Sequence, residues 1–136
     1  MKKTHHIQGE SMKLKVAFIV QAIVALPFGI GFVAVPELLM GPYINGTLTT
    51  EYLFLTRLYG SKALGLGLLA LLGIWFTELR AKRGLAYGLG LFTLSHCALF
   101  IIGSAQGILT SLGWMQAAIT GIITILYAIG LLSEKS

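Results

Sequence analysis

The hydrophobic residues of this chain fall into four long stretches separated by short polar breaks. The stretches cover about 14–35, 52–77, 85–103 and 112–132. Each is long enough for the roughly 20 residues of helix that a bilayer core of about 30 Å requires. Apolar runs of this length are typical of membrane-spanning helices. The pattern therefore predicts an all-α fold, a four-helix transmembrane bundle.

The basic residues lie almost wholly in alternate breaks of this pattern. They precede the first stretch, separate the second from the third and follow the fourth: Lys2, Lys3, Lys13, Lys15, Arg80, Lys82, Arg83 and Lys135. The first and third connections, about 36–51 and 104–111, contain neither Lys nor Arg. Because positively charged loops stay in the cytoplasm, both termini and the middle connection are predicted to be cytoplasmic. The two uncharged connections are predicted to face outward.

Composition supports a membrane protein and excludes an ordinary soluble domain. Of the 136 residues 56% are hydrophobic and only 11% are charged, and the mean hydropathy is +0.84. The net charge of +5 would suit nucleic-acid binding. However, the basic residues follow the loops and form no nucleic-acid motif. They indicate contact with anionic membrane lipids instead.

The first 12 residues differ from the rest of the chain. They are polar, contain the adjacent His5 and His6 and show no apolar period, so we expect a mobile tail ahead of a four-helix domain at 13–136. Two histidines without a third ligand do not define a metal site, and we expect neither a metal nor a cofactor. The single cysteine, Cys97, excludes an internal disulfide and a CxxC motif.

The longest outward connection contains two local signals. Pro36–Met40 is expected to lie along the membrane interface as a short amphipathic turn that ends at Gly41-Pro42. Asn45-Gly46-Thr47 matches the N-glycosylation pattern, and in a bacterial protein it is an Asn-Gly turn.

Small residues recur at helical spacing on two of the expected helices. They are Gly60, Ala63, Gly67 and Ala70 on the second helix, and Gly113, Ala117 and Gly121 on the fourth. Lipid provides no hydrophobic drive between helices, so such stripes mark where another helix packs closely. The sequence leaves open whether the second-helix stripe packs inside one chain or between copies in a homo-oligomer.

One polar neighbourhood is expected in the outer half of the membrane. At about 1.5 Å per residue, Arg57 lies about 9 Å, His96 about 12 Å and Gln116 about 8 Å from the outer ends of their helices. Glu37 and Glu51 lie at the rim above them. These five residues form a candidate ligand-binding or structural polar cluster.

Arg57 is the most informative member of this cluster, because an Arg at the centre of a membrane helix costs about 2.5–3.5 kcal/mol. On the helical wheel it lies near the small-residue stripe, whereas Lys62 lies away from it. Arg57 is therefore predicted to face inward and pair with Glu37 or Glu51, and Lys62 to snorkel to the outer headgroups. Three interpretations stay open: a structural ion pair, a site for an anionic lipid or ligand headgroup, and a catalytic or proton-carrying site with His96. No acid lies at the depth of His96 on another helix, which disfavours an enzyme and a proton-coupled transporter.

Several motifs resemble those of one group of membrane proteins. RLYG followed by LGLGLLA at 57–70 is similar to the second-helix signature of small bacterial four-helix membrane proteins of the DoxX-like and domain-of-unknown-function group. KLK at 13–15, FGIG at 28–31 and LGW at 112–114 fit the same group. The resemblance implies a four-helix membrane fold, without an assigned activity for most members and with quinone-linked sulfur oxidation for some. No residue here allows that role to be carried over.

The sequence thus predicts a small integral protein of the bacterial cytoplasmic (inner) membrane. It is expected to act without enzymatic activity, as a homo-oligomer or an accessory subunit of a larger complex, with a polar pocket around Arg57 in the outer leaflet. The alternatives are a quinone- or lipid-binding redox subunit or enzyme that uses Arg57 and His96, and a small-solute transporter.

Overall fold

The computed structural model describes residues 3–133, with side chains from residue 12 onward. Its helices in chain order are α1 (Lys3–Ala34), α2 (Pro36–Met40), the 3-10 helix η1 (Gly41–Tyr43), α3 (Thr50–Trp75), α4 (Leu79–Ala105) and α5 (Ser111–Ser133). Four helices are long and apolar enough to cross a membrane: α3, α4, α5 and the Met12–Ala34 part of α1. The predicted all-α class is confirmed, and these four helices could span a membrane, as the sequence predicts.

Two helices begin earlier than the hydrophobic pattern predicts. α1 is helical from Lys3, so the polar segment expected to form a separate tail continues the spanning helix. α4 begins at Leu79 instead of residue 85, which places Arg80 and Arg83 on the helix and not in the loop. Leu, Arg, Lys and Ala are good helix formers, and extending an existing helix needs no new nucleus. The side chains of His5 and His6 lie outside the described part of the chain.

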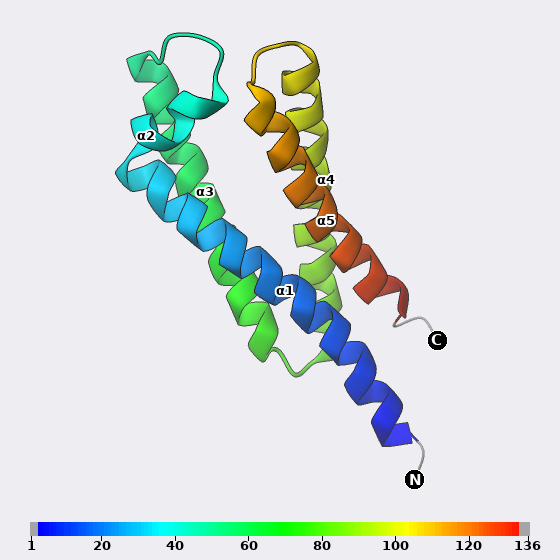
Figure 1. Cartoon of the computed structure of the whole chain (residues 1–136). Coiled ribbons are helices and arrows are strands. Elements are labelled where there is room, and N and C mark those ends of the chain that lie inside the picture. The colour runs from blue at the N-terminus through cyan, green and yellow to red at the C-terminus, as the bar shows by residue number, and fades with distance from the viewer. Residues whose placement is uncertain (1–2, 134–136) are drawn as a thin grey trace.

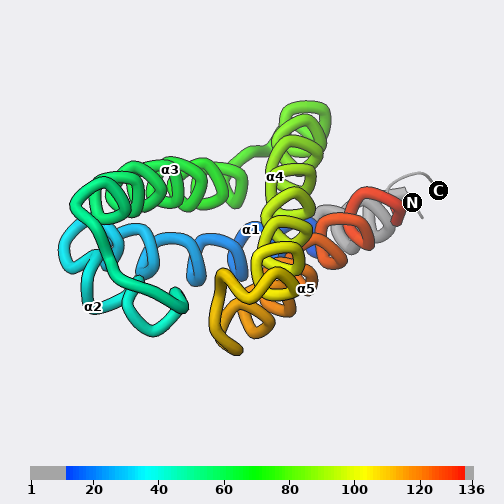
Figure 2. The backbone as a smooth tube through the Cα atoms, turned by 90° about the horizontal axis from the view of Figure 1, so that it is seen from above, coloured from blue at the N-terminus to red at the C-terminus, as the bar shows by residue number. Residues whose placement is uncertain are grey.

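The long helices form two antiparallel hairpins that cross each other (Figures 1 and 2). α1 packs along α3, α4 packs along α5, and the hairpins meet mainly where α1 crosses α5. The start of α1, the end of α5 and the α3–α4 connection lie at one end of the molecule (Figure 1). The opposite end, which carries α2 and the α4–α5 connection, is called the outer end below, as the charge pattern predicts. Which end faces the cytoplasm stays a prediction.

α3 and α4 diverge from each other, although a short connection joins them (Figure 1). We expected each helix to pack against the next one along the chain, because short connections favour such neighbours. The first and last pairs do so, whereas α3 and α4 make few contacts. The space between their outer halves is therefore not filled by helix packing.

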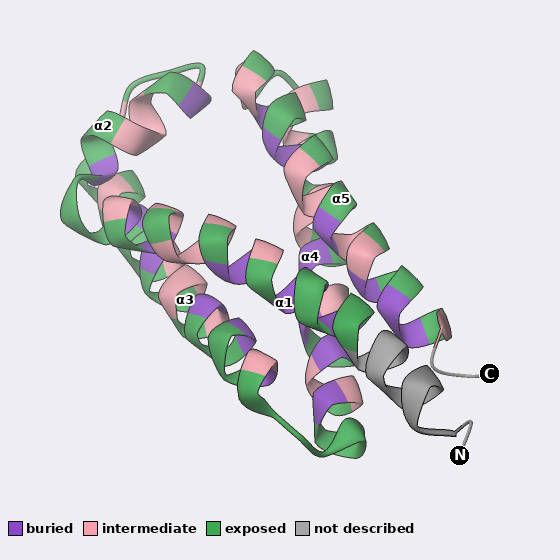
Figure 3. Cartoon of the chain, turned by 60° about the horizontal axis from the view of Figure 1, so that its bottom comes forward, coloured by how far each residue is buried: buried purple, intermediate pink, exposed green. Residues whose placement is uncertain are grey.

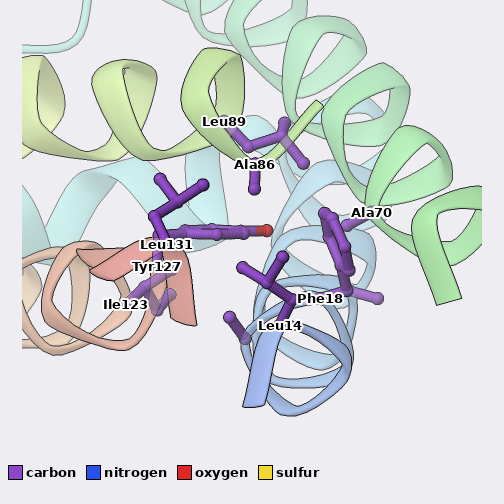
Figure 4. Close-up of a cluster of buried hydrophobic side chains, with 10 residues drawn as sticks. Leu14, Phe18, Ala70, Ala86, Leu89, Ile123, Tyr127 and Leu131 are labelled. Atoms are coloured by element: carbon purple, nitrogen blue, oxygen red, sulfur yellow. The ribbon is translucent and has the colours of Figure 1, made fainter. Parts of the chain in front are cut away.

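The core lies where the hairpins cross, towards the cytoplasmic end in the predicted orientation. The buried apolar side chains there are Leu14, Ala17, Phe18 and Ala22 of α1, Ala70 of α3, Ala86 and Leu89 of α4, and Ile123, Tyr127 and Leu131 of α5 (Figure 4). The rings of Phe18 and Tyr127 meet edge to face, with centroids 5.6 Å apart. The buried residues lie on the sides of the helices that face one another, and the outward sides are exposed (Figure 3).

Glycine lets α1 and α3 approach closely at one crossing point. A Cβ atom on Gly60 would lie 2.9 Å from Cβ of Phe32 and 3.0 Å from the carbonyl oxygen of Gly29. A Cβ atom on Gly67 would lie 2.8 Å from the side chain of Leu26. The small-residue stripe of α3 therefore packs against α1 within the chain, a use that the sequence left open.

The stripe of α5 lies against α4. Cys97 of α4 donates a hydrogen bond through its Sγ atom to the carbonyl oxygen of Ala117, at 3.3 Å. The same sulfur would be 3.5 Å from a Cβ atom on Gly121. Gly113 lies beside Ser104 at the outer end of α4. The lone cysteine is thus a packing residue between two helices.

The two outer connections are joined by hydrogen bonds. Nδ2 of Asn45 donates to the carbonyl oxygens of Gly107 and Leu109, at 3.1 and 3.2 Å. The backbone nitrogen of Thr110 donates to the carbonyl oxygen of Tyr43 at 2.8 Å. α2 occurs as the sequence predicts, at Pro36–Met40. The Asn45 bonds tie the α1–α3 hairpin to the α4–α5 hairpin at their outer ends, where the helices themselves diverge.

Candidate ligand cavity

The predicted polar cluster is only partly assembled, because Arg57 does not face the interior. Arg57 is exposed on the flank of α3, and Glu37 and Glu51 are exposed at the outer end. Within the described residues no ion pair joins Arg57 to either acid. Glu37 and Glu51 lie in the first turns of α2 and α3, where a carboxylate interacts favourably with the helix dipole.

The inward orientation of Arg57 was wrong for a geometric reason. The helical wheel places Arg57 about 60° from Gly60, and Gly60 is indeed in the contact with α1. However, the interior lies on the other side of Gly60, where Thr56 is buried and Tyr59 lines the cavity. The angle to a packing stripe does not say on which side of the stripe the interior lies.

His96 and Gln116 do face the interior. Gln116 is 7% exposed, and its Nε2 donates to the hydroxyl oxygen of Tyr43 at 3.4 Å. His96 is half-buried, and its ring lies 4.1 Å from the ring centroid of Phe92 and 5.4 Å from that of Tyr59. The Nδ1 atom of His96 lies 3.3 Å from the carbonyl oxygen of Phe92, to which it donates; in the neutral imidazole Nε2 is then an acceptor.

These two residues line a cavity in the outer half of the bundle. Its outer chamber has a volume of about 270 Å³. The walls of this chamber are Phe32, Met40, Tyr43, Tyr52, Leu55, Thr56, Tyr59, Phe100, Leu109 and Gln116. Tyr43 and Leu109 belong to the outer connections, so the Asn45 hydrogen bonds hold part of the lining in place.

A smaller inner chamber of about 70 Å³ continues towards the middle of the bundle. It shares with the outer chamber the four residues Phe32, Tyr59, Phe100 and Gln116. All four long helices contribute to its walls, which also include Gln21, Phe28, Phe92, Thr93, His96 and Thr120. The two chambers therefore adjoin at these four side chains.

Gln21 of α1 is a polar residue of the site to which the sequence analysis gave no role. It is 3% exposed, and its Oε1 atom is buried without a hydrogen-bond partner in the described part of the chain. The sequence does contain a signal for this residue, because Gln21 is an amide in the middle of an apolar helix. Such a group requires a hydrogen-bond partner in a membrane.

A groove on the lipid-facing side leads towards the inner chamber. It lies between α3 and α4 and is lined by Lys62, Gly65, Leu66, Leu69 and Phe92. Leu66 and Phe92 also line the inner chamber, so they separate the chamber from the groove. A Cβ atom on Gly65 would meet nothing within 4 Å.

The chemistry of the cavity is apolar and uncharged. Aromatic and aliphatic side chains form most of both chambers, and no Asp, Glu, Lys or Arg is among the residues that line them. The polar groups are the amides of Gln21 and Gln116, the imidazole of His96 and a few hydroxyls. Binding sites for small molecules commonly combine apolar walls with a few polar groups that set orientation. The described residues contain no group of three or more His, Cys, Asp or Glu that could hold a metal ion.

No family model, curated protein or solved structure matches this chain. The fold and the cavity therefore define the class of protein: an integral membrane bundle of four spanning helices with an apolar chamber in its outer half.

Proposed function

We propose that this chain is a non-enzymatic integral protein of the bacterial cytoplasmic membrane that binds a neutral lipophilic molecule. The observation that carries the proposal is the cavity of about 270 Å³, which is uncharged, rich in aromatic side chains and adjoined by a second chamber with polar groups. A lipid chain or a quinone-like ring fits this chemistry. The proposal keeps the idea of an outer-leaflet pocket, with walls that include Tyr59, His96 and Gln116 and do not include Arg57.

Access from the membrane supports a lipophilic ligand. The groove between α3 and α4 opens on the lipid-facing side and borders the inner chamber at Leu66 and Phe92. A water-soluble solute would gain nothing from such an entrance, whereas a molecule dissolved in the bilayer reaches it by lateral diffusion.

Arg57 and Lys62 interact with anionic lipid headgroups in this proposal. Both are exposed on α3 within its spanning segment. Long basic side chains at such positions extend towards the membrane interface and keep their charge in a polar environment. They anchor α3 in the outer leaflet and take no part in binding the neutral ligand.

A second candidate function is that of a subunit in a homo-oligomer or a larger membrane complex. Cβ atoms on Gly84 and Gly88 of α4 would meet nothing within 4 Å. Such a smooth helix face permits close approach of another helix in lipid. This assembly is compatible with ligand binding, because the two glycines do not line the cavity.

The test is a native mass spectrum of the protein released from nanodiscs made of host lipids. We expect a retained non-protein mass in the wild type that is lost in Leu55→Trp, since the larger ring fills the outer chamber that Leu55 lines. Leu58→Trp is the matched control, because Leu58 is 45% exposed on the same helix and does not line the cavity. A bare wild-type protein, or equal retention in both variants, would contradict the proposal.

A further inference from the structure

Gln21 lies at the wall of the inner chamber, where the cavity reaches furthest from the outer connections. Met12 is the first residue of the spanning part of α1. Gln21 is therefore about 14 Å along this helix at 1.5 Å per residue, near the middle of a bilayer core of about 30 Å. Its side chain is 3% exposed. Neither the backbone of its own helix nor a neighbouring side chain in the described part of the chain bonds its Oε1 atom.

An amide in this position is unfavourable unless something else bonds it. Lipid offers no hydrogen-bonding groups at this depth, and a buried polar group without a partner retains its full desolvation penalty. An apolar residue of similar shape would avoid this penalty. The amide therefore indicates a partner that occupies the chamber.

The two threonine hydroxyls of the chamber already have hydrogen-bond partners within the protein. Thr93 donates to the carbonyl oxygen of Gly90 at 3.0 Å and accepts from the hydroxyl of Thr124 at 2.9 Å. Thr120 donates to the carbonyl oxygen of Gln116 at 2.8 Å. Gln21 is the residue of this chamber whose side-chain oxygen is buried and unbonded.

We propose that Gln21 anchors the hydroxyl group of a neutral lipophile, an alcohol or a phenol, whose polar end is inserted deepest into the cavity. A hydroxyl donates to Oε1 and can also accept from Nε2, so it satisfies the amide in either orientation of the side chain. Phe28, Phe32, Tyr59 and Phe92 form an aromatic wall in the same chamber. The chamber contains no Lys or Arg that would recognise an anionic group. This inference rests on the proposed function and specifies the chemistry of its ligand.

The test uses fluorine NMR with the protein in nanodiscs and three probes of nearly equal size. They are para-trifluoromethylphenol, para-trifluoromethylanisole, which accepts but does not donate a hydrogen bond, and trifluoromethylbenzene, which does neither. We expect the phenol to bind the wild type about 5–10-fold more tightly than the other two probes, the ratio that one net hydrogen bond provides. In Gln21→Met we expect this preference to disappear, while trifluoromethylbenzene binds as it does to the wild type.

A structural role for Gln21 predicts a different result. If the amide bonded the protein, Gln21→Met would lower the thermal stability; we expect unchanged or higher stability, since an apolar side chain of similar shape replaces an unbonded polar one. Equal binding of the three probes to the wild type would overturn the inference and indicate that only water bonds Gln21. In that case the proposed function would still stand, because Leu55→Trp would still abolish binding of all three probes. If no probe bound the wild type, both proposals would fail.

Discussion

At the scale of single residues, the basic groups on the outer half of α3 lie outside the cavity, whose polar lining is uncharged. Arg57 and Lys62 are exposed on α3, whereas Gln21 and Gln116 are buried and line the cavity. A charge inside the cavity would need a buried counter-ion to offset its desolvation, whereas an amide needs only a hydrogen-bond partner. The interior therefore suits neutral ligands.

Arg57→Ala tests whether Arg57 takes part in the interior. We expect the free energy of unfolding in nanodiscs to change by less than about 0.5 kcal/mol, as for surface positions without special contacts. Ligand retention in the native mass spectrum should also be unchanged. A loss of several kcal/mol, as a broken buried ion pair produces, would show that Arg57 is paired inside the protein.

Asn45 is expected to stabilise the outer end of the molecule. Asn45→Ala removes both hydrogen bonds from its side chain to the α4–α5 connection, and we expect a loss of about 1–3 kcal/mol in unfolding free energy, measured by denaturant titration in detergent. Thr47→Ala is the matched control, because it removes the same glycosylation pattern while Thr47 is an exposed loop residue. Equal stability of the two variants would contradict a structural role for Asn45.

At the scale of elements, close packing of two helices depends on glycine at one crossing point. The sites Gly29 and Gly60 bring the backbones of α1 and α3 together, and any side chain there would displace one of the helices. By contrast, Gly65 lies on the same helix with open space where its Cβ would be. The same residue type thus has different roles within about one and a half turns of α3.

Gly60→Leu should therefore be far more destabilising than Gly65→Leu. We expect Gly60→Leu to cost at least about 1–3 kcal/mol of unfolding free energy, the usual effect of overpacking a core. Gly65→Leu should be neutral or slightly stabilising, because Leu has the higher helix propensity. Thermal unfolding of both variants in the same detergent measures the difference, and similar melting temperatures would refute the α1–α3 crossing.

At the scale of the whole molecule, the two hairpins meet in the half opposite the outer chamber. Phe18 of α1 and Tyr127 of α5 belong to the core at this crossing (Figure 4). At the outer end, hydrogen bonds between connections take the place of helix packing. The hairpins are closely packed where they cross and diverge towards the outer end. The outer chamber therefore fits between them without disturbing the packing of the core.

The orientation of the whole molecule is tested with single cysteines on a Cys97→Ser background. Thr47→Cys lies in an outer connection and Thr77→Cys in the α3–α4 connection. We expect a membrane-impermeant maleimide to label Thr47→Cys in intact bacterial spheroplasts and Thr77→Cys only after the membrane is opened. The reverse pattern would place both termini outside and contradict the topology predicted from the loop charges.

Part of the candidate site could be predicted from the sequence, because depth along a spanning helix follows from residue spacing. His96 and Gln116 were placed near one level in this way, and both line the inner chamber. The outward orientation of Arg57 could not be predicted, since a helical wheel gives angles within one helix and not the positions of its neighbours. Gln21 was not assigned a role, because its missing partner is visible only when its surroundings are known.

The sequence by itself determined the class of protein and the number of spanning helices. A bilayer accepts only long apolar segments that satisfy their own backbone hydrogen bonds, so these features depend on local composition. Only the tertiary structure decided which helices pair, that α3 and α4 diverge and that a cavity lies between the hairpins. These features depend on contacts between residues far apart in the chain, such as Gly29 with Gly60 and Asn45 with Leu109, and the spacing within one segment does not specify such contacts.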